Sequence, residues 1–326
     1  MLTRRTALIS AMPVIGALSA VPARAAQSFQ GSFQGFVASV YAEAAGQGIR
    51  REVLDAAFAG VTPNQSVIEK DQKQAEFTMT WGQYRALVIN DKRIADGRAA
   101  VAQNRALFSA VESRLQVASS VVAGIWGLES SFGVKTGNYK VVEALATLGW
   151  EGRRAAFFRA ELIAALKILN NGDISPDRMT GSYAGAMGQP QFMPTSYLRL
   201  AIDFDGDGRR DIWNSKADVL GSIGNYLARS GWRLGEPWGQ PIRLPPGVIP
   251  SGRDVRRPLA EWARVGVAPA NGRWAASGDT PSALVAPDGA GGESFLVFNN
   301  FAAIRRYNPS DFYAIAVGLI GDWVMT

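Results

Sequence analysis

The sequence of 326 residues contains no histidine and no cysteine. Without histidine, a Ser-His-Asp triad and histidine-ligated zinc or haem sites are excluded. Without cysteine, disulfides, thiol nucleophiles, iron–sulfur clusters and a lipid-modified cysteine are excluded as well. Any catalysis must therefore come from carboxylates, hydroxyls, amides, lysine or a bound cofactor.

Charged residues are also scarce, at 19% of the chain against 47% hydrophobic residues. This composition is typical of a globular protein, and the length predicts about two domains. The net charge is +6, but no run of lysine or arginine exceeds two residues, so the sequence contains no cluster of basic residues typical of a nucleic-acid-binding protein. We expect no nucleic-acid partner, and only a loose attraction to anionic polymers.

The first 25 residues have the features of an export signal. Arg4 and Arg5 precede an apolar stretch over residues 7–21 that is short for a bilayer, and residues 23–25 form a small-x-small cleavage pattern. Residues 3–8 also resemble a twin-arginine signal, so the general and the twin-arginine export routes both stay open. Cleavage lowers the net charge from +6 to +3, because three arginines and no acid are removed. We expect a periplasmic protein without a stable membrane anchor, and an uncleaved anchor is the alternative.

Hydrophobic periodicity predicts helices in the first half of the mature chain. From Phe33 to Ala44, apolar residues recur on one face of a helix. Further helices are expected over residues 52–59, 81–97, 99–118 and 153–169. The last of these precedes Asn-Asn-Gly at 170–172, a sequence typical of a left-handed helix end.

The composition and hydrophobic pattern of the chain change near residue 239. Over residues 240–292, prolines and glycines separate short pieces such as 242–244, 247–249 and 282–285, and residues 295–298 are typical of a strand. A final helix is expected over residues 310–324. We therefore predict an α-rich α+β protein with five parts: a signal peptide at 1–25, a helical N-terminal region at 26–118, a core at 119–239, a small β-subdomain at 240–298 and a C-terminal segment at 299–326 that completes the core.

An apolar segment over residues 121–133 contains a single carboxyl group, that of Glu129. Trp126, Leu128 and Phe132 flank it. Burial among such side chains disfavours the charged carboxylate and raises its pKa, which suits a general acid near neutral pH. The alternative is a glutamate that faces solvent at the end of a helix.

Residues 179–197 are rich in small residues, with isolated hydroxyl and amide groups among them. Small residues allow the backbone to approach a bulky ligand closely. Ser182 and Gln191 could then donate and accept hydrogen bonds with sugar hydroxyl and N-acetyl groups. The alternative is a close helix–helix contact in which these polar groups are buried and satisfied.

The acidic residues between 203 and 211 match the first nine positions of an EF-hand calcium loop. Asp203, Asp205 and Asp207 occupy alternate positions, a glycine is sixth and Asp211 is ninth. The twelfth position is Asn214 where an EF-hand has glutamate, so a solvated turn is the alternative. We expect a structural calcium ion here and no metal in catalysis.

These motifs, in this order, resemble the lytic murein transglycosylases of the B type, a lysozyme-like family. The similarity covers nearly the whole mature chain and includes residues 127–133, 181–197, 203–208, 225–226, 231–232, 307–308 and 313. It implies that residues 119–239 form a lysozyme-like catalytic core and that Glu129 is the single catalytic acid/base. It also implies a set of sugar-holding residues, namely Ser182, Gln191, Tyr226, Asn308 and Tyr313. In the calcium loop, it implies that Asp218 is the last ligand and that Arg209 contributes its backbone carbonyl.

A single carboxyl group is sufficient for the reaction of this family. Glycoside hydrolases normally use two carboxylates, but residues 119–138 and 180–196 hold no acid besides Glu129; Glu143 and Glu151 are the nearest candidates. If the sugar's own C6 hydroxyl attacks C1, Glu129 protonates the glycosidic oxygen and then accepts the O6 proton.

The predicted activity is cleavage of the MurNAc–GlcNAc β-1,4 bond of peptidoglycan, with 1,6-anhydro-MurNAc ends and no catalytic cofactor. The expected partners are peptidoglycan glycan strands, and the sequence predicts no particular protein partner. A hydrolytic muramidase and a non-catalytic peptidoglycan-binding scaffold are the alternatives.

Overall fold

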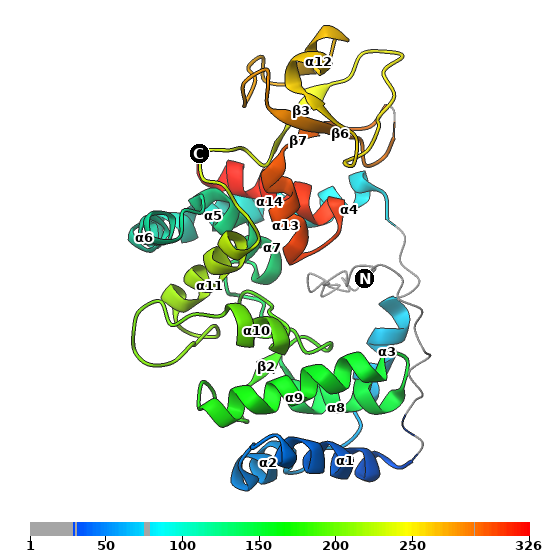
Figure 1. Ribbon diagram of the computed structural model, residues 1–326, viewed down its shortest axis with the longest axis vertical. Helices are drawn as coiled ribbons and strands as arrows, with labels where there is room; N and C mark the ends of the chain where they lie inside the picture. The colour runs from blue at the N-terminus through cyan, green and yellow to red at the C-terminus, as the bar shows by residue number, and fades with distance from the viewer. Residues whose placement is uncertain (1–28, 30, 75–78, 290) are drawn as a thin grey trace, which may run out of the picture. The chain divides into compact units, whose positions relative to one another are not determined.

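The computed structural model describes residue 29 and residues 31–74, 79–289 and 291–326 (Figure 1). The predicted signal peptide at 1–25 lies outside these residues. None of the helices in these ranges combines the length and the apolar composition that a membrane crossing requires. The described residues form two compact units, which are treated separately below. The first unit contains the described residues up to 74 and Phe132–Ser222, and the second contains residues 79–131 and the described residues from Ile223 to Thr326.

The first unit is helical. Its helices are α1 (Phe33–Gly46), α2 (Arg51–Phe58), α3 (Gln65–Gln74), α8 (Val141–Glu151), α9 (Ala155–Asn171), α10 (Pro194–Leu200) and the first half of α11 (Lys216–Arg229). The paired helices α8 and α9 form its centre, and α1, α2, α3 and α10 pack against them (Figure 1). A short antiparallel pair, β1 (Tyr139–Lys140) with β2 (Thr180–Gly181), leads into the segment that contains Ser182.

Local sequence signals explain the ends of these helices. The side chain of Ser32 accepts a hydrogen bond from the Gly35 amide and begins α1. The buried residues of α1 all lie on the predicted apolar face: Phe33, Phe36, Val40 and Ala44. Helix α9 ends at Gly172, which has a φ of 84° in the left-handed region. Both predictions from the sequence are confirmed.

The second unit is built around two helices that pack unusually closely. Its helices are α4 (Trp81–Val88), α5 (Asp91–Gln103), α6 (Arg105–Leu115), α7 (Ser119–Ser130), α12 (Leu259–Arg264), α13 (Asn299–Tyr307) and α14 (Asp311–Val324), together with the second half of α11. Helices α7 and α14 run antiparallel. A Cβ atom on Gly124 would lie 2.1 Å from the Val317 carbonyl oxygen, and one on Gly321 would lie 2.3 Å from that of Ser120. Glycine at both positions therefore allows the two backbones to touch.

The second unit also contains a five-stranded antiparallel sheet. Its strands are β3 (Gly239–Arg243), β4 (Arg256–Pro258), β5 (Ala268–Pro269), β6 (Pro281–Val285) and β7 (Ser294–Val297), in the order β4-β6-β7-β3-β5. An apolar cluster fixes it, with Trp262 of α12 packed against Ile242, Leu284 and Leu296 of the strands. The predicted strands near 282–285 and 295–298 are confirmed, whereas residues 247–249 form a turn and loop.

Two of the predicted helices are interrupted. The expected helix over 81–97 breaks at Ile89–Asn90, because the Asn90 side chain accepts a hydrogen bond from the Arg93 amide and begins a new helix. The expected helix over 99–118 breaks at Asn104, between α5 and α6. Helix α7 ends at Ser130, because Ser131, Phe132 and Gly133 all have positive φ. The α-rich α+β class is confirmed, and the domain boundaries stay a prediction.

Candidate active site

Glu129 lies at the end of α7, and its carboxylate accepts a hydrogen bond from the Tyr313 hydroxyl at 2.7 Å. Both side chains are buried, with Glu129 only 7% exposed. The antiparallel register of α7 and α14 explains the pairing: Ser120 lies against Gly321 and Gly124 against Val317, so the opposite ends of the helices bring Glu129 to Tyr313. The prediction that Glu129 faces the interior is confirmed, and a glutamate turned to solvent is excluded.

The environment of Glu129 keeps its carboxyl group protonated at neutral pH. Burial raises its pKa from 4.5 to about 8, and the hydrogen bond from Tyr313 opposes part of this rise because it stabilises the charged form. The group can therefore donate a proton near pH 7. Once it has done so, the Tyr313 hydroxyl remains as a donor to the new carboxylate.

Tyrosines surround this acid. The ring of Tyr307 lies between those of Tyr226 and Tyr313, with centroid distances of 4.5 and 6.4 Å. Burial first, and then the charge of Glu129, raise the pKa of Tyr307 and of Tyr313, so both phenols stay neutral donors. The Tyr226 hydroxyl donates to the Arg306 carbonyl oxygen at 2.6 Å. The rings of Tyr226, Tyr307 and Tyr313 therefore form one aromatic wall, and Tyr313 connects it to the Glu129 carboxyl group.

Asn308 stands at the junction between α13 and α14. It is buried, and its side-chain oxygen accepts a hydrogen bond from the Ser310 amide at 3.1 Å. Ser310 in turn begins α14, because its hydroxyl accepts from the Tyr313 amide. Asn308 thus shapes the turn that delivers Tyr313 to Glu129.

Tyr84 is a neighbour of the acid that the sequence analysis did not assign to the site. Its ring contacts those of Trp81 and Phe312. Burial and the charge of Glu129 also raise its pKa, while Arg93 of α5 lowers it. The sequence signal that could have identified Tyr84 is its hydroxyl group, because phenylalanine would make a purely apolar contact equally well.

Ser182 and Gln191 lie in the first unit, in a tightly folded loop. The Ser182 hydroxyl accepts from the Ala186 amide at 3.1 Å. The Gln191 amide nitrogen donates to the carbonyl oxygens of Thr136 and Gly188, at 2.9 and 2.8 Å. Both side chains are buried and bonded to backbone, so the alternative of satisfied polar groups describes these contacts, and sugar binding by Ser182 and Gln191 stays a prediction.

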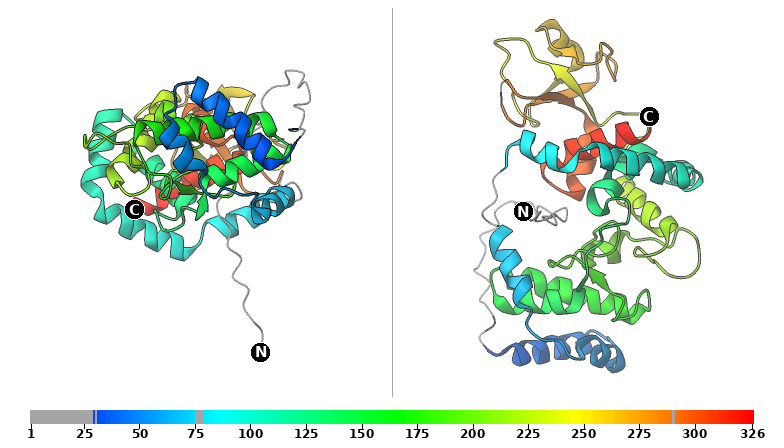
Figure 2. Two further views of the ribbon diagram at one scale, coloured as in Figure 1. Left: turned by 90° about the horizontal axis from the view of Figure 1, so that it is seen from below. Right: turned by 180° about the vertical axis from the view of Figure 1, so that it is seen from behind.

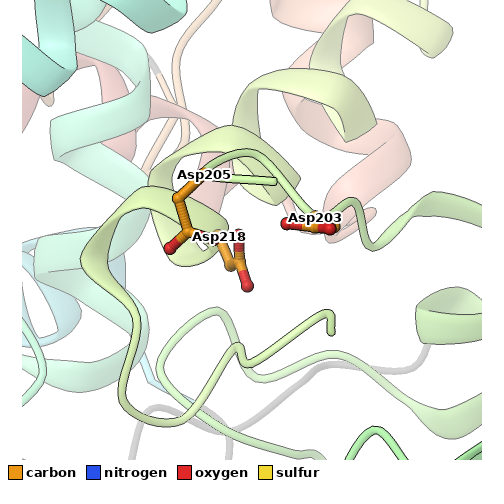
Figure 3. Close-up of side chains that lie close together, drawn as sticks. All are labelled: Asp203, Asp205 and Asp218. Carbon is orange, nitrogen blue, oxygen red and sulfur yellow. The ribbon is translucent and has the colours of Figure 1, made fainter. Parts of the chain in front are cut away.

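The acidic loop gathers three of the predicted metal ligands (Figure 3). One carboxylate oxygen each of Asp203, Asp205 and Asp218 lies within 4.8 Å of the others. Asp207 is not one of this group, and its carboxylate is paired with the Arg209 guanidinium at 3.4 Å. Asp218 is fully buried and accepts from backbone amides at 2.7 Å. A cluster of hard oxygen donors suits calcium.

A buried carboxyl group with a raised pKa, hydrogen-bonded to a tyrosine on a helix-rich fold, is the arrangement expected of a lysozyme-like glycan-cleaving enzyme. Comparison with known proteins agrees. Residues 32–322 match the family described as the transglycosylase SLT domain. Membrane-bound lytic murein transglycosylase B of Escherichia coli K12 is 31% identical over 246 residues, which are 75% of this chain and 67% of that protein. The chain therefore belongs to the SLT family of lytic murein transglycosylases.

Solved structures resemble the whole fold. SltB3 from Pseudomonas aeruginosa, in complex with NAG-NAM-pentapeptide, has 44% identity and a TM-score of 0.86, covering 89% of this chain and 79% of its own. The same protein has been solved with NAG-anhNAM-pentapeptide. The Escherichia coli transglycosylase Slt35 in complex with calcium has 28% identity and a TM-score of 0.77, covering 94% of this chain and 98% of its own.

Proposed function

We propose that this enzyme cleaves the β-1,4 bond between MurNAc and GlcNAc in peptidoglycan glycan strands and leaves 1,6-anhydro-MurNAc ends. The observation that carries the proposal is the buried Glu129 carboxyl group, protonated at neutral pH and hydrogen-bonded to Tyr313. The charge of Glu129 raises the pKa of three tyrosines, Tyr84, Tyr307 and Tyr313, which places their phenols near this acid. The SltB3 complexes with NAG-NAM and NAG-anhNAM peptides support the same substrate and product.

The proposed reaction uses Glu129 twice. Its proton passes to the glycosidic oxygen as the bond from C1 to that oxygen breaks. The C6 hydroxyl oxygen of the same MurNAc then bonds to C1, and the Glu129 carboxylate accepts the O6 proton, which restores the acid. No water is consumed, because the attacking hydroxyl is already held within the sugar at high effective concentration. Tyr313 stabilises the carboxylate between the two transfers.

We further propose a set of residues that bind the sugar of the substrate, namely Ser182, Gln191, Tyr226, Asn308 and Tyr313. For Tyr226, the support is the aromatic wall that it forms with Tyr307 and Tyr313. For Ser182 and Gln191, the support is the resemblance of their segment to the family, together with the hydrogen bonds that fix both side chains to the backbone of their loop.

The acidic loop is proposed to bind a structural calcium ion. Asp203, Asp205 and Asp218 are already gathered, and Asp207 and the Arg209 carbonyl would complete the ligand set. The ion would hold the loop to α11 and take no part in proton transfer. Slt35 with bound calcium supports this assignment.

We also propose that the chain acts in the periplasm after cleavage of the signal at 1–25. The support is the sequence pattern of that segment and the location of the murein substrate.

Digestion of purified peptidoglycan sacculi tests the reaction. Wild-type protein should release muropeptides with 1,6-anhydro ends, each lighter by one water than a hydrolysis product. Glu129→Gln should lose about 100-fold or more of the rate yet still bind sacculi. Glu143→Gln is the matched control, because its side chain can still accept from Asn64, and it should stay active. Products with reducing ends would favour a hydrolytic muramidase. Binding to sacculi without any product would favour a non-catalytic scaffold. An active Glu129→Gln variant would refute the assignment of Glu129 as the acid.

A further inference from the structure

Helix α4 has only eight residues and carries Tyr84 on the side of the acid. Tyr84 contacts Phe312, whose neighbour along α14 is Tyr313, the hydrogen-bond partner of Glu129. A helix this short is marginal by itself. The position of Tyr84 therefore depends on what holds α4.

The segment between β6 and β7 holds the beginning of α4 (Figures 1 and 2). Both oxygens of the Asp288 carboxylate accept from backbone amides of its first turn, from Trp81 at 2.6 Å and from Gly82 at 2.9 Å. This is notable because Thr80 and Gln83 already form a capping box there. Together, Asp288 and the capping box satisfy four backbone amides at this N-terminus, those of Thr80, Trp81, Gly82 and Gln83. The negative carboxylate also interacts favourably with the positive end of the helix dipole.

Glu293 strengthens the same attachment through side chains. Its carboxylate accepts from the Trp81 indole nitrogen at 2.6 Å and forms an ion pair with Arg85 at 3.4 Å. Trp81 is 1% exposed and has edge contacts with Phe295 of β7 and Phe312 of α14. Trp81 is thus fixed on both sides, by the sheet and by the helix that contributes Tyr313.

We infer that Asp288 and Glu293 are positioning residues for the transglycosylase reaction: they attach α4 to the β-subdomain and so keep Tyr84 against Tyr313 and Glu129. This inference rests on the proposed role of Glu129. It gives the sheet a function in catalysis, although none of its strands carries a residue proposed to contact the sugar. Loosening α4 would admit water beside the acid, which lowers the cost of its charged form.

The titratable groups that face this acid come from three elements, and a fourth element contributes a charge beside Tyr84. Tyr313 lies on α14, Tyr307 ends α13 and Tyr84 lies on α4, while Arg93 of α5 faces Tyr84. The tyrosines are neutral in the working pH range, since burial raises the pKa of each. A displaced Tyr84 should therefore act mainly by hydrating Glu129 and lowering its pKa from about 8.

The test compares Asp288→Asn, Glu293→Gln and the double variant in the full chain. Asp279→Asn is the control, because this carboxylate binds Ser277 in the same region and makes no contact with α4. Rates on soluble glycan strands give kcat and KM between about pH 5 and pH 9. We expect kcat to fall about 10-fold to 100-fold in the double variant, with KM nearly unchanged. The basic limb of the rate profile should move to lower pH by about one unit.

The inference would be overturned if the double variant had a lower melting temperature but an unchanged kcat and an unchanged basic limb of its rate profile. It would also be overturned if Asp279→Asn changed kcat and the basic limb as much as the double variant does. Glu293→Gln keeps an acceptor for the Trp81 indole and is mild enough to remain folded, so its smaller shift in the same direction is also required. Glu129→Gln in the same assay separates the two proposals. If that variant is active, the proposed function fails; if it is inactive and Asp288→Asn behaves as wild type, only the role of the β-subdomain fails.

Discussion

Replacing Glu129, the proposed catalytic acid, should stabilise this protein. Glu129 is almost completely buried, and its pKa rises from 4.5 to about 8 on folding. A carboxyl group with a raised pKa binds its proton more tightly in the folded state than in the unfolded state. Stability is therefore lost as pH rises from 4.5 towards 8, at about 1.4 kcal/mol for each pH unit.

At pH 7 this amounts to about 3 kcal/mol in the free energy of unfolding. Glu129→Gln removes the ionisation but keeps the shape and the oxygen that accepts from Tyr313. The variant should thus be more stable than wild type by a margin that vanishes below about pH 4.5, grows with pH, and levels off above about pH 8. The same change should abolish turnover, which is the expected exchange between function and stability at an active site.

Urea unfolding at a series of pH values, followed by tryptophan fluorescence, measures this margin. Asp177→Asn changes an exposed acid of the first unit and serves as the control. A hydrogen bond from Ser175 lowers the pKa of Asp177, so this group stays charged and the control should show no trend between about pH 4.5 and pH 8. Equal stability of wild type and Glu129→Gln at every pH would refute the reasoning, because it would mean that the carboxyl group is not desolvated in the folded protein.

Three further outcomes are expected. Tyr313→Phe removes the donor that stabilises the charged carboxylate, so the basic limb of the rate profile should move upward while kcat falls; a downward shift would contradict the assigned hydrogen bond. Millimolar calcium should raise the melting temperature of wild type and of the control Asp177→Ala, but not of Asp205→Ala; no rise in wild type would count against the site. Gly124→Ala should lower thermal stability by about 1–3 kcal/mol or more because α14 leaves no room for a methyl group, whereas Gly46→Ala, with open space around it, should be nearly neutral in the same scan.

The sequence alone was sufficient for the chemistry and the family. The absence of histidine and cysteine left carboxylates as candidates, and the apolar surroundings of Glu129 predicted a buried acid. Helix α1 and the end of α9 also followed from local signals. Such features depend on near neighbours in the chain, so periodicity and capping residues report them directly.

Only the tertiary structure decided which distant residues meet. Tyr313 bonds to Glu129 across 184 positions, and Asp288 reaches Trp81 across 207. Such pairs depend on the register in which α7 packs on α14 and on where the sheet meets α4, and periodicity shows that a side chain is buried without showing against what. For the same reason, the sequence did not show that Tyr84 lies near Glu129, or that Asp207 pairs with Arg209 rather than with the other aspartates. The number of possible long-range pairings is large, and backbone contact at a few glycines selects among them.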